Sequence, residues 1–307
     1  MNSITEKLLE IVSDWKGEFK GAYNIREDGE CAARQSSQNI IIDSKTDKPG
    51  LDIHVKDGTR GEKVYIPACV THGNVDDLVY NDFFIGEDCD IQIIAGCGVH
   101  TDSDEEARHN GIHRFFVGRN SIVTYEEKHI GTGSGTGAKS IDPVTEVTLE
   151  ENAKLTMDTV QIRGVDSSVR TTKGVLKDGA KLIIRESLMT DGYEVAKTEF
   201  DVVLEGADSG VDLVSRSVAR GKSRQEYRSC IRGENACSGH SECDAILVDD
   251  GVVSAAPELV AAHPEANLIH EAAIGKIAGE QIIKLKTLGL TESEAEETII
   301  KGFLGQL

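Results

Sequence analysis

The sequence contains no long apolar run and few aromatic residues. Phe, Trp and Tyr make up 5% of its 307 residues. A membrane-spanning helix needs about 20 consecutive apolar residues, which this chain does not have. Its first 19 residues are charged and amphipathic rather than typical of a signal peptide, so we expect a cytoplasmic protein without a membrane partner.

Basic residues are also scarce. Lys and Arg number 33 against 53 Asp and Glu, which gives a net charge of -20. Nucleic-acid binding depends mainly on cationic side chains that displace counterions from phosphates. This charge argues against a DNA or RNA partner.

Seven cysteines are present, but no two of them form a Cys-x-x-Cys pair. This absence argues against a zinc ribbon or a ferredoxin-type cluster site formed by one short segment. In a cytoplasmic protein an odd number of cysteines favours free or metal-binding thiols over a disulfide framework.

The N-terminal segment, residues 1–38, is predicted to be a helix followed by a connector. Apolar residues recur at helical spacing from Ile4 to about Trp15. Residues 20–38 are rich in glycine and charge and predict at most one short hairpin. From about Asn39 the apolar period changes to two, which is typical of strands.

A short motif recurs along the chain, in which an apolar residue precedes a polar turn, a small residue and another apolar residue. It begins at Ile85, Val117, Leu149, Leu176, Leu204 and Ile231, at spacings of 32, 32, 27, 28 and 27 residues. Such regular spacing of short strands indicates stacked coils that cover each other's apolar faces. We predict a mainly β protein with a right-handed parallel β-helix over residues 39–256; a β-sandwich is the alternative.

The glycine-rich residues 132–139 superficially resemble a phosphate-binding loop. The Gly-x-x-x-x-Gly-Lys-Ser/Thr order is missing, and the segment joins two strands instead of opening a helix. We predict a surface loop and no nucleotide site.

A helical region is predicted over residues 257–307. Strand character is expected to end near Val253, and residues 266–288 fit a helix that stops at Gly289. Thr291 and Glu294 form a capping box that starts a second helix. Two short amphipathic helices outside a solenoid would form a docking surface.

Cys97 is a candidate reactive thiol. Gly96 and Gly98 flank it and would leave the sulfur approachable, and His100 and His113 could lower its pKa. The alternative is a small buried apolar residue, which is the commoner role of a lone cysteine on a strand.

A second group of candidates lies near the C-terminus. Cys230, Cys237 and Cys243 fall within 14 residues, and strand alternation places Cys243 on the face opposite Glu242 and Asp244. All three cysteines could instead fill the solenoid interior. His270 and Glu271, expected at the start of the C-terminal helix, add ligands to a mixed Cys/His/carboxylate set that suits iron better than magnesium or calcium.

The C-terminal stretch resembles the SufB/SufD family of iron-sulfur cluster assembly proteins. The similarity is carried by His270-Glu271-Ala272, Lys276-Ile277, Glu280-Gln281, residues 288–292, Glu294-Ala295, Ile299-Ile300 and Gly302-Phe303, and upstream by residues 215–227, Cys243-Asp244, Gly96-Cys97 and Ile112-His113.

The resemblance implies a non-catalytic scaffold with a parallel β-helix core, paired with a second such subunit. Its C-terminal helices would bind a SufC-type ABC ATPase, to which ATP hydrolysis would belong. Cys97 would match the sulfur acceptor. The nascent iron-sulfur cluster would form at the subunit interface near His270 and Glu271.

Two departures from the family pattern affect the metal ligands. Gly251 stands where some members carry a further cysteine, and Ile269 stands where a second carboxylate precedes the histidine. Cys243 is the replacement candidate. A homodimer is expected, and a heterodimer with a related subunit and the identity of the sulfur donor stay open.

Two other functions fit a β-solenoid. A polysaccharide lyase would need a groove with carboxylates, basic residues and aromatic platforms, and the low aromatic content argues against it. A purely structural partner of an ATPase would bury every cysteine.

Overall fold

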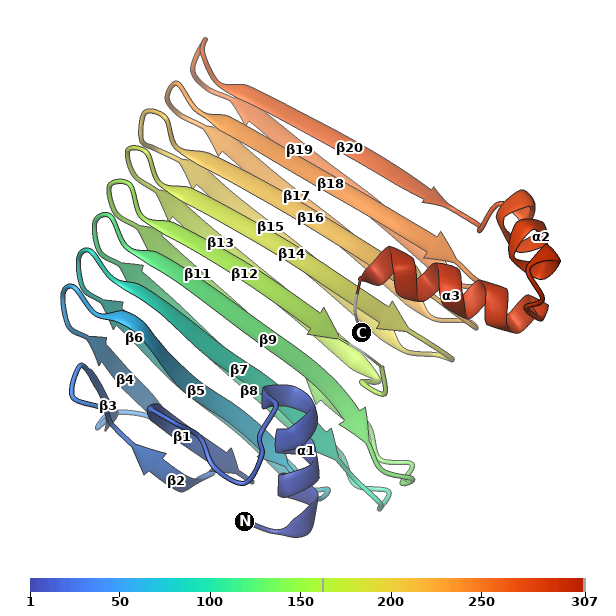
Figure 1. Cartoon of the computed structure of the whole chain (residues 1–307), viewed down its shortest axis with the longest axis horizontal. Coiled ribbons are helices and arrows are strands. Elements are labelled where there is room, and N and C mark those ends of the chain that lie inside the picture. The colour runs from blue at the N-terminus through green and yellow to red at the C-terminus, as the bar shows by residue number, and fades with distance from the viewer. Residues whose placement is uncertain (162, 306–307) are drawn as a thin grey trace.

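The computed structural model describes residues 1–161 and 163–305 and shows a flattened β-solenoid with an N-terminal helix and two C-terminal helices (Figure 1). Its strands form two ten-stranded sheets, and within the body of the solenoid the pairing is parallel. The mainly β parallel β-helix predicted from the repeat is therefore confirmed.

The first sheet contains, in spatial order, β2 (Glu30–Gln35), β1 (Ala22–Glu27), β5 (Arg60–Val70), β7 (Asp90–His100), β9 (Ile122–Thr132), β12 (Lys154–Gln161), β14 (Lys181–Thr190), β16 (Gly210–Ala219), β18 (Ser238–Leu247) and β20 (Asn267–Gly275). The second contains β19 (Val252–Ala261), β17 (Arg224–Gly233), β15 (Val195–Leu204), β13 (Ser167–Leu176), β10 (Lys139–Ile141), β8 (Ala107–Val117), β6 (Val75–Ile85), β4 (Gly50–Val55) and β3 (Ile40–Ser44), with β11 (Val144–Leu149) pairing with β8 and β13.

The repeated motif forms one corner of successive coils. Asp88, Asn120 and Asn152 have φ angles of 56°, 57° and 57° there. Asn and Asp tolerate this left-handed conformation better than other residues with a side chain. The small residue that follows is buried in each case, as with Ser121 and Ala153. The polar turn and the small residue of the sequence motif thus form these corners.

The core consists of inward-facing side chains from both sheets. Residues of successive coils stack directly, as Phe83 and Phe115 do with ring centroids 4.6 Å apart. In the body of the solenoid the strands alternate inward and outward residues, so one face of each sheet is buried and the other is exposed or covered by a helix.

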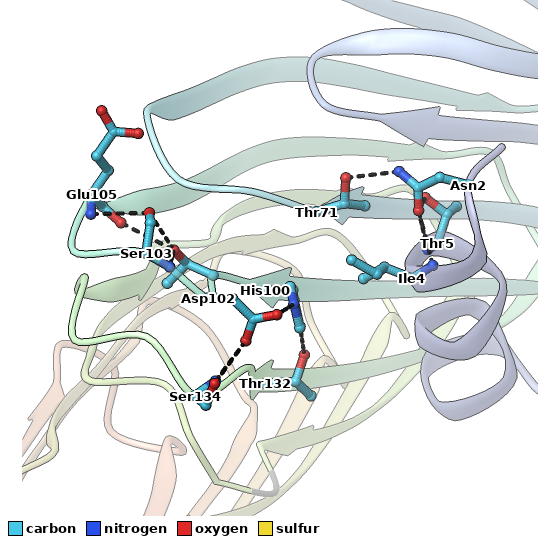
Figure 2. Close-up of polar contacts among 11 residues, drawn as sticks. Asn2, Ile4, Thr5, Thr71, His100, Asp102, Ser103, Glu105, Thr132 and Ser134 are labelled. Atoms are coloured by element: carbon cyan, nitrogen blue, oxygen red, sulfur yellow. Dashed lines mark hydrogen bonds and ion pairs between the residues drawn. The ribbon is translucent and has the colours of Figure 1, made fainter.

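Helix α1 (Ser3–Ser13) covers the outer face of the first sheet near its N-terminal end. Asn2 caps the helix through the backbone N–H groups of Ile4 and Thr5, and its side-chain amide donates to Thr71 Oγ1 (Figure 2). The expected hairpin in residues 20–38 is the antiparallel pair β1 and β2.

The C-terminal part differs from the prediction. Residues 266–288 do not form one helix, because β19 and β20 add a last coil to the solenoid. β20 pairs in register with β18, from Ser238 opposite Asn267 to Ile246 opposite Gly275. Strands therefore run past residue 256, the expected end of the β-helix.

Two helices follow the last strand: α2 (Gly279–Thr287) and α3 (Glu292–Leu304). The predicted capping box of Thr291 and Glu294 starts α3. Ile300 and Leu304 of α3 pack against Val218 and Val248 of the solenoid. No helix of the described residues is long and apolar enough to cross a membrane.

Candidate functional site

Cys97 lies on β7 with its side chain in the solenoid interior, 5% exposed. The flanking glycines face the other way, under α1. A Cβ on Gly96 would lie 2.4 Å from the carbonyl oxygen of Val12, and one on Gly98 would lie 2.8 Å from a methyl group of Leu8. The absence of side chains at Gly96 and Gly98 therefore lets α1 pack closely on β7. It does not expose the Cys97 sulfur.

The two histidines expected to activate Cys97 do not do so. His100 faces outward and contacts Thr132 Oγ1 at 2.9 Å and Asp102 at 3.1 Å (Figure 2). Burial raises the pKa of the Cys97 thiol well above its ordinary value, and the carboxylate of Glu127 adds to the rise. Because burial lowers the pKa of His113 to about 4, its imidazole is neutral at pH 7 and supplies no compensating charge.

A chain of buried polar side chains starts near Cys97 and runs along the interior. Asn81 Nδ2 lies 3.3 Å from His113 Nε2, and His113 Nδ1 lies 2.8 Å from the hydroxyl of Tyr125. Tyr125 donates to Glu127 Oε1 at 2.8 Å. Arg170 Nη1 donates to Glu127 Oε2 at 2.6 Å. Hydrogen bonds thus connect four strands from both sheets.

The chain continues toward the C-terminal coils. Arg170 Nε lies 3.6 Å from Glu186 Oε1, and Ser215 donates to Glu186 Oε2 at 2.7 Å. Ser215 is paired in register with Cys243 on the next strand of the sheet. Polar side chains therefore link the coil of Cys97 to the coil beside Cys243.

Charge pairing explains how this network stays ionised inside the solenoid. Burial alone would raise the pKa of Glu127, but His129 and Arg170 hold it well below its ordinary value. Burial would lower the pKa of Arg170, and the carboxylates of Glu127 and Glu186 raise it instead. The paired shifts indicate a carboxylate and a guanidinium that are both charged.

The low pKa of His113 predicts acid sensitivity. The unfolded histidine, with an ordinary pKa of 6.5, binds a proton before the folded one does. His113 therefore stabilises the fold fully above pH 6.5, and this contribution falls by about 2 kcal/mol between pH 7 and pH 5. Urea unfolding should show a weaker pH dependence in His113→Gln. The exposed control His54→Gln should keep the wild-type slope, and equal slopes in all three proteins would contradict the assignment.

Cys243 faces inward on β18 and is 1% exposed. Burial raises the pKa of its thiol to about 12, with further contributions from Glu186 and Asp244. Cys237 is also buried, but Cys230 faces outward on β17 and is half-buried. The predicted alternation of Cys243 with Glu242 and Asp244 is confirmed.

His270 and Glu271 lie in β20, not at a helix start as expected. His270 pairs in register with the inward-facing Ser241, and its Nδ1 contacts the Ser241 carbonyl oxygen at 3.0 Å. Glu271 pairs with Glu242 on the outer face and is exposed. The last two coils therefore place Cys243 and His270 on the inner face of the sheet and Glu271 on the outer face.

A second cluster forms around Glu271 on that outer face. The ligand atoms of His240, Glu242 and Glu271 all lie within 4.8 Å of one another. Asp212 Oδ1 accepts from His240 Nδ1 at 2.8 Å, which directs His240 Nε2 toward Glu271 Oε2, 3.8 Å away. A carboxylate that orients a histidine in this way is common behind metal ligands.

Sequence reasoning did not join these three residues. Alternation on one strand places His240 and Glu242 on a common face, but the pairing of Glu242 with Glu271 depends on the strand that the sequence did not predict. Mixed imidazole and carboxylate ligands suit a divalent transition metal such as iron.

Comparison with known proteins assigns the family. The model described as "SUF system FeS cluster assembly, SufBD core domain" matches residues 82–303. The chain belongs to the SufBD family. The matched region extends from β6 into α3 and includes Cys97, Cys243, His270 and Glu271.

SufBD relatives from archaea cover most of the chain. An iron-sulfur cluster assembly SufBD family protein of Methanothermobacter thermautotrophicus is 29% identical over 88% of this chain and 66% of its own length. One of Archaeoglobus fulgidus is 29% identical over 80% of this chain and 66% of its own length. One of Methanocaldococcus jannaschii is 26% identical over 99% of this chain and its full length.

Proposed function

We propose that this SufBD protein is a non-catalytic scaffold for iron-sulfur cluster assembly, with Cys97 as sulfur acceptor and the last coil as the place where iron and sulfur meet. The observation that carries the proposal is the buried polar chain from Asn81, which lines the same cavity as Cys97, to Ser215, the in-register neighbour of Cys243. An interior of this kind suits the passage of a polar atom between two thiols better than an apolar core would.

Iron is proposed to bind at the C-terminal end of this path. His240, Glu242 and Glu271 would take up the ion on the outer face, while Cys243 and His270 would provide thiolate and imidazole on the inner face. Because the two sets lie on opposite sides of the sheet, cluster formation needs a rearrangement of the last coil. We infer that ATP hydrolysis by a bound ABC-type ATPase drives this rearrangement.

Two surfaces support the proposed partners. β19 and β20 are the C-terminal edges of both sheets, and Leu259, Ile269 and Ile274 are exposed there. Unpaired edges with apolar residues favour pairing with a second subunit, homomeric or related. Helix α2 has no buried residue. The exposed apolar side chains of Ile283 on this helix (63% exposed) and Leu288 directly after it (72% exposed) form a surface to which the ATPase would bind.

The test is anaerobic reconstitution with ferrous iron and sulfide. Wild-type protein should develop iron-sulfide absorption, and Cys243→Ser with Glu271→Ala should remove it. The single variants should differ: Glu271→Ala should lose iron binding before sulfide is added, whereas Cys243→Ser should keep the iron and lose the cluster.

A matched control exists on the other sheet. Cys230 and Glu258 are in-register neighbours on β17 and β19, so Cys230→Ser with Glu258→Ala makes the same chemical change away from the site. This control should retain the cluster. Full cluster occupancy in the Cys243/Glu271 variant would contradict the ligand assignment.

A purely structural partner of the ATPase is the second candidate, because Cys97 and Cys243 are both buried with raised pKa values. The expectation that such a protein buries every cysteine is not met, since Cys31 is exposed and Cys230 is half-buried. Reconstitution separates the two functions. A structural subunit would take up neither iron nor sulfide, with or without the ATPase and ATP.

A further inference from the structure

A cavity of about 280 Å³ opens at the N-terminal end of the solenoid. The hairpin of β1 and β2 and the segment between β3 and β4 form its mouth, and inward-facing residues of β5 to β8 form its inner wall. Cys97 is among the wall residues. The volume suits a small molecule and is too small for a folded segment of another protein.

The lining of this cavity has the opposite charge to the protein as a whole. The chain carries a net charge of -20, yet the cavity is lined by four cationic side chains and no carboxylate: Arg26, Arg34, Lys45 and Lys48. A concave site with one sign of charge raises the local concentration of ligands of the opposite sign. The cavity therefore favours a small anion.

Two of these four cations, Arg34 and Lys48, are not neutralised by a carboxylate of the described residues. Arg26 is paired with Asp77, and Lys45 with Asp52 and Asp82, which lie outside the lining. Arg34 instead donates to Asn24 Oδ1 and Ser44 Oγ at 2.8 Å each, and Lys48 lies 4.3 Å from the Tyr80 ring centroid. Within the described chain neither forms a salt bridge.

The inner wall contains one buried polar atom that lacks a hydrogen-bond partner among the described residues. Asn81 is 5% exposed, and its Oδ1 atom has no hydrogen-bond partner among the described residues. The imidazoles of His109 and His113 also line this wall, and Gly111 between them gives both rings room, since a Cβ there would lie 3.0 Å from His113 Nε2 and 3.5 Å from His109 Nε2. Buried polar atoms without a partner are rare, and this acceptor suits an S–H or N–H group of a molecule in the cavity.

We propose that this cavity admits a small anionic sulfur carrier, an inorganic polysulfide or an amino-acid-sized persulfide, and presents its sulfane sulfur to Cys97. The inference rests on the proposed role of Cys97 as sulfur acceptor and adds the chemical class of its donor. Arg34 and Lys48 attract the anion at the mouth, and the polar inner wall replaces the water that the anion loses on entry.

The transfer is a thiol exchange without net oxidation. Because the thiolate and not the thiol is the nucleophile, the anionic terminal sulfur of the carrier first accepts the Cys97 proton. The Cys97 thiolate then attacks that sulfur, a new S–S bond forms on Cys97, and the adjacent S–S bond of the carrier breaks. The electron pair leaves with the shortened carrier. For tetrasulfide, the products are Cys97 persulfide and trisulfide, and the Cys97 proton ends on the outer sulfur of the persulfide.

Cys31 also lines the mouth, but it is too far away to pass sulfur on directly. Register relations place Cys31, Arg26, Ala68 and Cys97 in one row across β2, β1, β5 and β7. Three strand spacings separate the two Cα atoms by about 14 Å. The carrier therefore has to enter the cavity itself, and Cys31→Ser should load Cys97 at the wild-type rate.

The experiment treats the full chain anaerobically with tetrasulfide and follows Cys97 persulfide by alkylation and peptide mass spectrometry. Arg34→Glu with Lys48→Glu should slow loading by at least about tenfold and weaken its salt dependence. Arg224→Glu with Arg228→Glu, exposed positions on the outer face of β17, changes the net charge equally and should leave the rate unchanged.

Three outcomes would overturn the proposal: an unchanged rate in the Arg34/Lys48 variant, an equal loss in the Arg224/Arg228 control, or loading of Cys97 by a protein-bound persulfide but not by tetrasulfide. Reconstitution of Cys97→Ser tests the proposed function separately. If that variant acquires cluster sulfur as well as wild type does, the role of Cys97 fails, whichever carrier enters the cavity.

Discussion

Replacing Arg170 by methionine is expected to lower the free energy of unfolding by about 3–5 kcal/mol. Arg170 is 4% exposed and lies between two buried carboxylates, 2.6 Å from Glu127 Oε2 and 3.6 Å from Glu186 Oε1. Methionine fills a similar volume but leaves both carboxylates without their cation. Urea unfolding at pH 7 measures the loss.

Arg185→Met is the matched control for this prediction. Arg185 lies on the outer face of β14, and its ion pair with Asp158, at 3.5 Å, is exposed on both sides. Such a pair contributes at most about 1 kcal/mol. Adding Glu127→Gln to Arg170→Met should recover part of the lost stability, because it removes one of the unpaired charges. Equal losses in the two single variants would contradict a buried charge network.

Much of the solenoid could be predicted because each coil repeats the same local chemistry. Asn120 and Asn152 mark corners where the backbone needs a positive φ, and small residues follow where the interior is narrow. Each requirement involves only a few neighbouring residues, so the corners appear in the sequence as a motif at regular spacing. Stacked coils are then the arrangement that buries every apolar face.

The last coil could not be predicted in the same way. The segment around His270 and Glu271 contains alanines and other residues that form helices readily, and local propensity favours a helix there. The segment instead forms strand β20, because pairing with β18 completes the backbone hydrogen bonds at that edge of the sheet. The helix prediction was wrong because a tertiary partner outweighs a small local preference.

The same limit applies to the candidate site. Alternation correctly places Cys243 on the face opposite Glu242, but the partners in the buried network come from distant strands, as with Glu127 and Arg170, 43 residues apart. Whether Glu127 and Arg170 meet depends on how successive coils, which differ in length, align with one another. Sequence could identify Cys97, Cys243, His270 and Glu271 as candidates, but it could not show that Glu271 faces away from Cys243.

Gly251 stands where the resemblance to SufB/SufD proteins implies a further cysteine in some members. Gly251→Cys should cost about 3 kcal/mol of stability rather than complete a metal site. Gly251 lies in the turn between β18 and β19, and a Cβ on it would lie 2.2 Å from the carbonyl oxygen of Ala219 and 2.6 Å from its carbonyl carbon. Both atoms belong to the backbone of the preceding coil, so no side-chain rotation relieves the clash.

Thermal unfolding and iron content per folded protein test this prediction together. Gly251→Ala should lose nearly as much stability as Gly251→Cys, since the clash arises at the Cβ atom and not at the sulfur. Gly275→Cys is the control, because a Cβ there meets nothing within 4 Å. A stable Gly251→Cys protein with increased iron binding would show that the turn can accept the family cysteine. If the variant is destabilised as expected, a cysteine at this corner requires a different path of the backbone past Ala219. Cys243 is then the thiol that the last two coils of this protein can offer to the cluster.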